Sequence, residues 1–300
     1  MSFGTRQLRA FLFVAELGSL GRAAKEVHLT QPALSRMIHE LERHCGLELF
    51  ERHPLGMRLT EAGDALVPLA RSVMLEMTRT EETMSIMRGT GRGVVRVGAI
   101  AGVARHILPS AVRNLIDNNI DLKVYVLEGT GGELATAIAD GSIDIAIAHD
   151  NLADDDVAKV RDTGYTDCCS VVCSTAHPFA VRNDCTLDEV LKADWVLPRP
   201  DATPRKLLQE VVTNSGHRMP RAVVETVSPS AVAAFVRRSL LLGWLPRSLY
   251  ADEEEAGQIC ALSIPELSLH RRYFIYKRRR AVLSPTVTSF LDAFQIKDTP

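Results

Sequence analysis

One stretch decides the fold, and it runs from residue 8 to residue 63 as LRAFLFVAELGSLGRAAKEVHLTQPALSRMIHELERHCGLELFERHPLGMRLTEAG. Apolar residues recur there every three or four positions in three successive segments, which predicts three amphipathic helices. The second segment begins after Ser19 and the third after Thr30, both of which are residue types that cap helix N-termini. Because only His28 and Leu29 separate these two segments, we expect the helices to cross steeply, as in a helix-turn-helix.

A β-hairpin is predicted directly after the third helix. Gly46 is placed to end that helix in the left-handed conformation. Leu47 to Phe50 and Met57 to Thr60 then flank a polar loop that contains Pro54 and Gly56, which predicts two short strands joined by a turn. We interpret this hairpin as a wing beside the third helix.

A long helix is predicted from Glu61 to Arg88. Its apolar residues are separated by three or four positions throughout, and such a stripe requires a partner helix. Pro68 lies inside the segment and is expected to kink it. The residues of the predicted stripe are Ala62, Leu66, Leu69, Val73, Met77, Thr80, Met84 and Met87.

The third helix and the wing carry the side chains that we predict to contact DNA. Recognition helices need short or planar donors in their first turns to reach the edges of bases in the major groove, and the wing would lie over the flanking backbone. The alternative is an ordinary helical bundle with a solvated polar face. The predicted DNA-binding residues are Thr30, Gln31, Pro32, Ser35, Arg36 and His39 in the helix, and Arg52, His53 and Arg58 in the wing.

Composition changes after Gly89, Gly91 and Gly93, where strands begin to alternate with helices. This order predicts parallel βαβ units and hence an α/β region. Strands are expected at residues 94–100, 122–127, 143–149, 167–174, 194–197, 221–226 and 271–277, and helices at 104–118, 133–140, 204–215, 229–238 and 284–295.

The N-terminal stretch resembles the signature of LysR-type transcriptional regulators over its whole length. Four segments of the remaining chain show a weaker resemblance to the effector-binding region of that family: VRVGAIAGVARHILP at 95–109, ADGSIDIAIAH at 139–149, HPFA at 177–180, and the chain from Tyr273 onward. The matching residues of the N-terminal stretch are Phe11, Ser19, Ala23, Ala24, Gln31, Pro32, Ala33, Ser35, Leu41, Glu42, Gly46, Leu49, Phe50, Arg52, Leu59, Thr60, Ala62 and Gly63.

This resemblance implies a multi-domain α/β protein. Residues 1–60 would form a winged helix-turn-helix, 61–91 a dimerisation helix and hinge, and 92–300 a two-subdomain sensor similar to type II periplasmic binding proteins. Subdomain I would comprise about 92–162 and 268–300, and subdomain II about 163–267. The resemblance also implies a homodimer that assembles into a homotetramer, binds pseudo-palindromic double-stranded promoter DNA, and responds to a small-molecule effector. RNA polymerase is a further candidate partner.

An effector site is expected between the two subdomains, where helices begin. Backbone N–H groups at helix N-termini favour a carboxylate or another anion, and hydroxyl groups there add hydrogen bonds. The alternative for each Thr or Ser is a helix cap without a ligand. The predicted effector-binding residues are Ala101, Gly102, Thr130, Gly131, His149, Ala202, Thr203 and Ser228.

One departure from the family pattern bears on that site. Two glycines are common in the family before the segment that ends at Pro246, and Ser239 and Leu241 stand there in this chain. Their side chains are expected to reshape the neighbouring pocket.

Other classes of function find little support in the sequence. The chain has 300 residues, a net charge of −2 and 46% apolar residues, and its longest apolar runs are too short to span a membrane. We find no motif of an enzyme, and we expect neither a metal nor a cofactor. A transport-type solute-binding protein would explain residues 92–300 but not the first 90. Without a recognisable leader, we expect the protein in the cytoplasm.

Two clusters of residues allow alternative interpretations. Four cysteines could form a redox or zinc site, but their spacing contains no CxxC pair and favours small buried core residues. They are Cys168, Cys169, Cys173 and Cys185. The basic run from Lys277 to Arg280 resembles a localisation signal, although a solvated strand end explains it better.

Overall fold

The computed structural model describes residues 3–54, 56–88, 92–118, 122–149 and 152–293. The chain forms two compact units. One comprises Met1–Val94 with Ala137–Ser142, and the other comprises Val95–Thr136 with Ile143–Pro300. The predicted hinge residues Gly89 and Gly91 lie outside the described residues.

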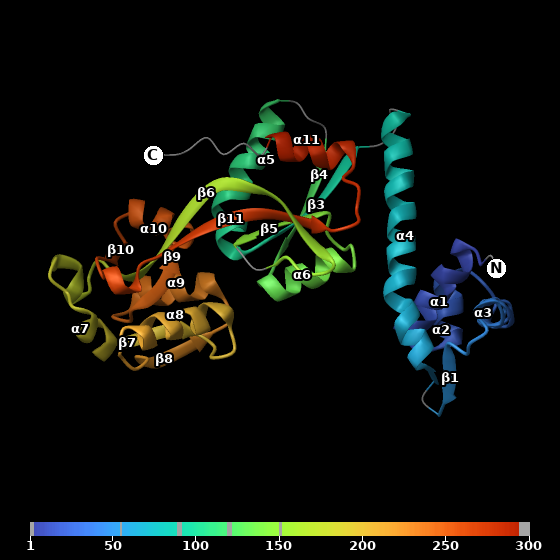
Figure 1. The fold of residues 1–300 in the computed structure, drawn as a ribbon, viewed down its shortest axis with the longest axis horizontal. Coiled ribbons are helices and arrows are strands. Elements are labelled where there is room, and N and C mark those ends of the chain that lie inside the picture. Colours follow the sequence, from blue (N-terminus) through green and yellow to red (C-terminus); the bar gives the residue numbers. More distant parts are fainter. Residues whose placement is uncertain (1–2, 55, 89–91, 119–121, 150–151, 294–300) are drawn as a thin grey trace. The chain divides into compact units, whose positions relative to one another are not determined.

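The first unit contains the three predicted helices, the hairpin and the long helix (Figure 1). Its core is built by the apolar stripes of the helices, and Phe11 packs against Phe50 with ring centroids 5.3 Å apart. The elements are α1 (Thr5–Leu17), α2 (Leu20–Glu26), α3 (Gln31–Cys45), β1 (Phe50–His53), β2 (Gly56–Leu59) and α4 (Glu61–Met87).

The predicted caps are confirmed in two of three cases. The Ser19 hydroxyl accepts a hydrogen bond from the Arg22 N–H at 3.4 Å, and Gly46 ends α3 with a left-handed φ of 69°. Thr30 occupies the N-cap position of α3, but its side chain makes no capping hydrogen bond. Ser19 and Thr60 cap their helices by accepting from the N–H of the third helical residue, and the Thr30 hydroxyl makes no such bond to Ala33.

The predicted first strand of the wing was wrong in position. β1 begins at Phe50 instead of Leu47 and pairs with β2 in a register that places Phe50 opposite Leu59. The N–H groups of Leu49 and Phe50 donate to the side chain of Glu42, and the carbonyls of Glu48 and Leu49 accept from Thr60. The chain before Phe50 is thus bonded to α3 and to the residue after β2, and it is not paired as a strand. Arg52 and His53 consequently lie in a strand.

The long helix α4 is confirmed almost residue for residue. The Thr60 hydroxyl caps it by accepting from the Gly63 N–H at 3.1 Å, and the helix continues through Pro68. The predicted stripe divides in two, however. Ala62 and Leu66 pack into the core of the first unit, whereas the later apolar residues of the stripe are exposed: Leu69, Val73, Met77, Met84 and Met87.

A sheet with the strand order β10-β6-β11-β5-β3-β4 and β9 added on β6 organises the second unit. β3 pairs with β5 in parallel, and a separate pair, β7 and β8, is also parallel, which confirms the predicted βαβ character. The strands are β3 (Gly93–Ala99), β4 (Leu122–Glu128), β5 (Ile145–His149), β6 (Val157–Ser174), β7 (Asp194–Pro198), β8 (Arg221–Thr226), β9 (Gly243–Pro246), β10 (Ile259–Leu262) and β11 (Leu269–Arg278).

Helices cover these strands. The predicted helix at 104–118 is a π-helical turn followed by α5, and the helix predicted to end at residue 295 is described only to Ala293. The segments are η1 (Val103–Ile107), α5 (Leu108–Asp117), α6 (Gly131–Ala139), η2 (Pro178–Val181), α7 (Leu187–Lys192), α8 (Thr203–Asn214), α9 (Pro229–Arg238), η3 (Arg247–Leu249), α10 (Ala251–Glu255), η4 (Pro265–Leu267) and α11 (Pro285–Ala293).

Separate hydrophobic clusters divide the second unit into two subdomains, and β6 and β11 run through both subdomains (Figure 1). Subdomain I is built on β3, β4, β5, η1, α5 and α11 around Val97, Ile147 and Phe290. Subdomain II is built on β7 to β10 and α7 to α10 around Trp195 and Trp244. Along the part of the chain that the structure describes, no helix has both the length and the apolar character of a membrane span.

β6 begins ten residues before the predicted strand at residue 167. Its first half is polar and half-exposed, and it pairs with β11 along the connection between the subdomains. Such a crossing strand has no buried face of its own, and therefore lacks the alternation by which strands are recognised.

Candidate DNA-binding surface and effector site

α3 presents a polar face opposite its buried residues. Leu34, Ile38 and Leu41 are buried in the core of the first unit. Of the predicted DNA-binding residues in this region, five are exposed and Ser35 is partly buried; the exposed residues are Thr30, Gln31, Pro32, Arg36 and His39. The sequence prediction therefore separates the two faces of this helix correctly.

The side chains on this face differ in their surroundings. A Cβ atom placed on Gly21 would lie 3.5 Å from Oε1 of Gln31, so Gln31 lies against the start of α2. Nδ1 of His39 lies 3.0 Å from Oε2 of Glu42. Arg36 is exposed, and no acidic side chain of the described residues pairs with it. A free guanidinium on a polar helix face suits contact with a phosphate.

Sequence reasoning missed Arg43. It is exposed, follows His39 by four positions and Arg36 by seven, and thus lies on the same face of α3. The spacing of four and seven positions from His39 and Arg36 is the sequence signal that places Arg43 on this face. In the wing, His53 and Arg58 are exposed, and Nε of Arg58 lies 3.9 Å from Oε1 of Glu51, a weak surface contact.

Seven of the eight predicted effector residues lie at four helix starts, and two of their hydroxyl groups act as caps. The Thr130 hydroxyl donates to Glu133 at 2.9 Å, while the Thr130 N–H donates to the same carboxylate at 2.7 Å. This backbone hydrogen bond lowers the pKa of Glu133. The Ser228 hydroxyl accepts from the Ala231 N–H at 3.3 Å. The carboxylate of Glu133 thus already accepts hydrogen bonds at the start of α6, where an anionic ligand was expected.

The other two helix starts have no side-chain cap. Ala202 precedes α8 without a capping hydrogen bond, and Thr203 is exposed. Arg205 stands in the first turn of α8, and burial lowers the pKa of its guanidinium. η1 continues a helix that begins at Ala101, and Gly102 in its first turn is helical and buried. The start of α8 is therefore the more accessible of the two to a ligand.

His149 and the two departures from the family pattern are accommodated by packing. His149 is partly buried at the end of β5, and its carbonyl accepts from the Tyr276 hydroxyl at 3.3 Å. The Ser239 hydroxyl donates to the Phe235 carbonyl at 2.7 Å and closes the end of α9. Leu241 packs against the buried residues around Val232.

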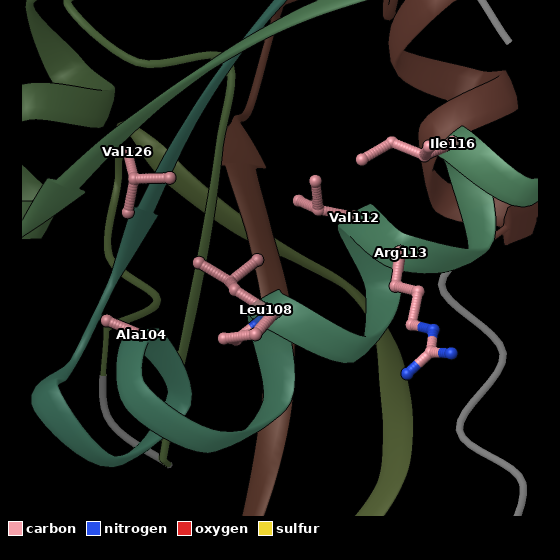
Figure 2. A pocket seen from close by; sticks show the side chains of 7 residues that line it. Ala104, Leu108, Val112, Arg113, Ile116 and Val126 are labelled. Atoms are coloured by element: carbon pink, nitrogen blue, oxygen red, sulfur yellow. The ribbon is translucent and has the colours of Figure 1, made fainter.

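An apolar groove of about 310 Å³ lies elsewhere, between α5 and β4. Figure 2 shows Leu108, Val112 and Ile116 along one side of α5, with Val126 of β4 facing them and Arg113 pointing away. None of the predicted effector residues lines it. The lining residues are Ala104, Leu108, Pro109, Val112, Arg113, Ile116 and Val126.

Five of the six cysteines are free thiols in the core of subdomain II or at its edge, and the sixth, Cys45, is a free thiol at the end of α3. Cys169 and Cys173 are fully buried, as predicted, and burial raises the pKa of the Cys169 thiol to about 12. Sγ of Cys173 lies 3.5 Å from Sγ of Cys260 on the neighbouring strand β10, a pairing that the sequence spacing does not reveal. Among the described residues, no three His, Cys, Asp or Glu side chains are grouped to hold a metal ion.

Comparison with known proteins agrees with this architecture. Residues 5–64 match the family described as "Bacterial regulatory helix-turn-helix protein, lysR family", and residues 88–297 match the "LysR substrate binding domain". The GalR transcriptional regulator of Pseudomonas putida is 28% identical over 294 residues, which cover 96% of this chain and 72% of GalR. GbpR of Rhizobium radiobacter is 29% identical over 234 residues, or 76% of each chain.

Solved structures share the fold. ArgP from Mycobacterium tuberculosis superposes with a TM-score of 0.71 at 21% identity, covering 98% of this chain and 97% of ArgP. Full-length CbnR in complex with its target DNA gives a TM-score of 0.69 at 19% identity, covering 97% of this chain and 99% of CbnR. The chain combines a winged helix-turn-helix, a long helix and a two-subdomain α/β region, and both end regions match models of one family. The chain belongs to the LysR family of DNA-binding transcriptional regulators with an effector-binding domain.

Proposed function

We propose that this chain binds a pseudo-palindromic promoter site through α3 and the wing of a homodimer, and that a small carboxylate or other anion bound between subdomains I and II controls the complex. The observation that carries the DNA-binding part is the exposed polar face of α3, where Gln31 and Arg36 stand clear of the buried stripe. The residues proposed to contact DNA are Thr30, Gln31, Pro32, Ser35, Arg36, His39, Arg52, His53 and Arg58.

Within this surface, the short and planar side chains would read bases and the cations would bind phosphates. Gln31→Ala and Ser35→Ala are therefore expected to weaken binding to the target site far more than binding to random DNA, each base contact being worth roughly 1–3 kcal/mol. Arg36→Ala serves as the comparison, because loss of a phosphate contact weakens binding to all sequences about equally. Gel-shift titrations on the target and on a scrambled duplex at one salt concentration decide. Equal losses on both duplexes for Gln31→Ala would count against base reading.

Self-association is proposed to use α4 first. Its exposed stripe from Leu69 to Met87 is apolar, and a helix of this kind is stabilised by packing against a second copy. The exposed groove between α5 and β4 is a second apolar surface that a tetramer could cover (Figure 2). Residues 1–60, 61–91 and 92–300 remain the proposed DNA-binding, dimerisation and effector-binding regions, with the protein acting in the cytoplasm and RNA polymerase a candidate partner.

The effector is proposed to bind at the helix starts of the two subdomains. Thr203 stands at an exposed start that lacks a side-chain cap, whereas Thr130 and Ser228 cap α6 and α9 and Gly102 is buried. An anion would gain most from the start of α8, because its N–H groups have no side-chain acceptor.

Thermal unfolding in the presence of aromatic and aliphatic carboxylates tests this proposal, since a ligand that binds only the folded state raises Tm. Thr203→Val should reduce the shift that an active carboxylate produces, because it removes the hydroxyl and keeps the backbone N–H, while Thr130→Val should lower the Tm of the free protein and leave the shift. DNA bending and footprint length with the same ligand then test the switch; no change with a ligand that demonstrably binds would refute it.

A further inference from the structure

Arg105 joins the two subdomains at a point away from the crossing strands. It belongs to η1 of subdomain I, and its Nη2 atom donates to both carboxylate oxygens of Glu253 in α10 at 2.8 Å. Its Nη1 atom donates to the carbonyl of Leu249 in η3 at 2.8 Å, and Nη2 lies 3.4 Å from Oδ2 of Asp252. One side chain of subdomain I therefore holds a carbonyl and two carboxylates of subdomain II.

The backbone around Arg105 fits subdomain II closely. Gly102, one turn earlier, is buried beside Ser248 of η3, and a Cβ atom at position 102 would lie 2.2 Å from the Ser248 hydroxyl oxygen. The Ser248 N–H donates to the buried Asp167 of β6 at 3.4 Å, and the Tyr273 hydroxyl of β11 donates to the same carboxylate at 2.9 Å. Thus η3 is anchored to the crossing strands, and η1 rests on it.

The bonds of Arg105 differ from those of an ordinary surface ion pair. The Arg105 side chain is 30% exposed and that of Glu253 only 16% exposed, so solvent screens the pair less than the exposed pairs of the chain. The contact with Glu253 also raises the pKa of Arg105, which keeps its charge. Hydrogen bonds between two charged partners are about twice as strong as neutral ones.

We infer that Arg105 is a latch between the subdomains, meaning a side chain whose bonds hold them in one relative orientation. Subdomain I can rotate about β6 and β11 and carry η1 away from α10 only after the bonds of Arg105 to Glu253 and Leu249 break. The inference rests on the proposed function only in assigning the latch a part in the effector response. A ligand bound between the subdomains would act on promoter DNA by changing the fraction of molecules in which the latch is closed.

Hydrogen–deuterium exchange of the free, full-length protein tests the latch without DNA or ligand. The amides of Tyr250 and Glu254 bond within η3 and α10, and local opening of this segment controls their exchange. Arg105→Gln should speed their exchange roughly tenfold, the factor expected for loss of one charge-assisted bond. Arg221→Gln is the matched control, since Arg221 is 79% exposed and its 3.6 Å contact with Asp194 lies within subdomain II. Equal exchange in the two variants would overturn the inference.

Glu253→Gln and the double variant provide a second measurement. If the two side chains act as one latch, the double variant exchanges no faster than Arg105→Gln alone, whereas multiplied effects would show independent roles and overturn the inference. The proposed function fails separately. Fast exchange in Arg105→Gln, combined with a promoter bend that no bound ligand alters, would support the latch and refute the proposed control of DNA bending by an effector.

Discussion

The Oε1 atom of Glu42 in α3 accepts a hydrogen bond from the backbone N–H of Leu49 at 3.0 Å. The next N–H along the chain, that of Phe50, donates to the same oxygen at 3.3 Å. Because Leu49 and Phe50 are buried and lead into β1, one carboxylate on the proposed recognition helix sets where the wing begins. The Glu42 side chain thus links the position of the wing to that of α3, the two elements that are proposed to contact DNA.

Replacing Glu42 should loosen the wing. Glu42→Ala leaves two buried N–H groups without their acceptor, and we expect the free energy of unfolding of the N-terminal unit to fall by about 1–3 kcal/mol. Glu42→Gln keeps an oxygen that can accept, and should lose less. Both tryptophans lie in the second unit, so far-UV circular dichroism is the suitable probe and tryptophan fluorescence the internal control. Equal losses of unfolding free energy in Glu42→Ala and Glu42→Gln would show that an accepting oxygen at this position does not stabilise the wing.

Gly56 should tolerate substitution less well than Gly46. Gly56 has a φ of 133°, and a Cβ atom there would lie 2.2 Å from the carbonyl oxygen of Gly18, to which the Met57 N–H donates at 2.8 Å. Gly46 has a φ of 69° with open space around it. Gly46→Ala should therefore cost about 1–2 kcal/mol for the left-handed backbone alone. Gly56→Ala should cost more, because the wing must also move off α1; urea denaturation followed by circular dichroism compares them, and a smaller cost at Gly56 would contradict the docking of the wing.

The N-terminal unit could be predicted well because its determinants are local. Apolar periodicity located α1 to α4, and Ser19 and Gly46 marked boundaries through their own backbone chemistry. Thr30 occupies the N-cap position without a side-chain cap, an outcome that its residue type does not reveal. The start of β1 was missed because Glu42 bonds to residues seven and eight positions away, which no period describes.

The second unit was harder because its key contacts join distant segments. The crossing half of β6 pairs with β11 more than a hundred residues later and carries no alternating pattern. Arg105 and Glu253 are 148 positions apart, and nothing in either local sequence marks them as partners. Residue types at helix starts did identify candidate effector residues, but whether Thr130 binds a ligand or caps its helix depends on the reach of Glu133, which only coordinates show.

The exposed stripe of α4 should control the oligomeric state. Met77→Lys places a charge among Leu69, Val73 and Met84, and we expect it to weaken the dimer at least tenfold, because burying an unpaired ammonium is costly. Thr78→Lys is the matched control, since Thr78 is exposed but lies on the other side of the helix. Sedimentation equilibrium over a concentration series measures both. If Met77→Lys and Thr78→Lys dimerise with equal affinity, the self-association surface lies elsewhere.

The buried thiol of Cys169 should make the second unit less stable at high pH. Its folded-state pKa is raised to about 12 by burial, whereas an unfolded cysteine ionises near pH 8.5. Above about pH 8.5 the unfolded chain loses a proton that the folded chain keeps, so stability falls by up to about 1.4 kcal/mol per pH unit for this thiol; below that pH its contribution is complete. Urea denaturation followed by tryptophan fluorescence at pH 7.5 and 9.5 measures the slope, because Trp195 and Trp244 share the core with Cys169. Cys169→Ala removes one titrating group and should reduce the slope, whatever its cost at pH 7.5; the buried Cys173, whose pKa is also raised by burial, retains its own share. Should the variant retain the full pH dependence, the Cys169 thiol would have to ionise normally in the folded protein, and its burial between β9 and β11 would be wrong.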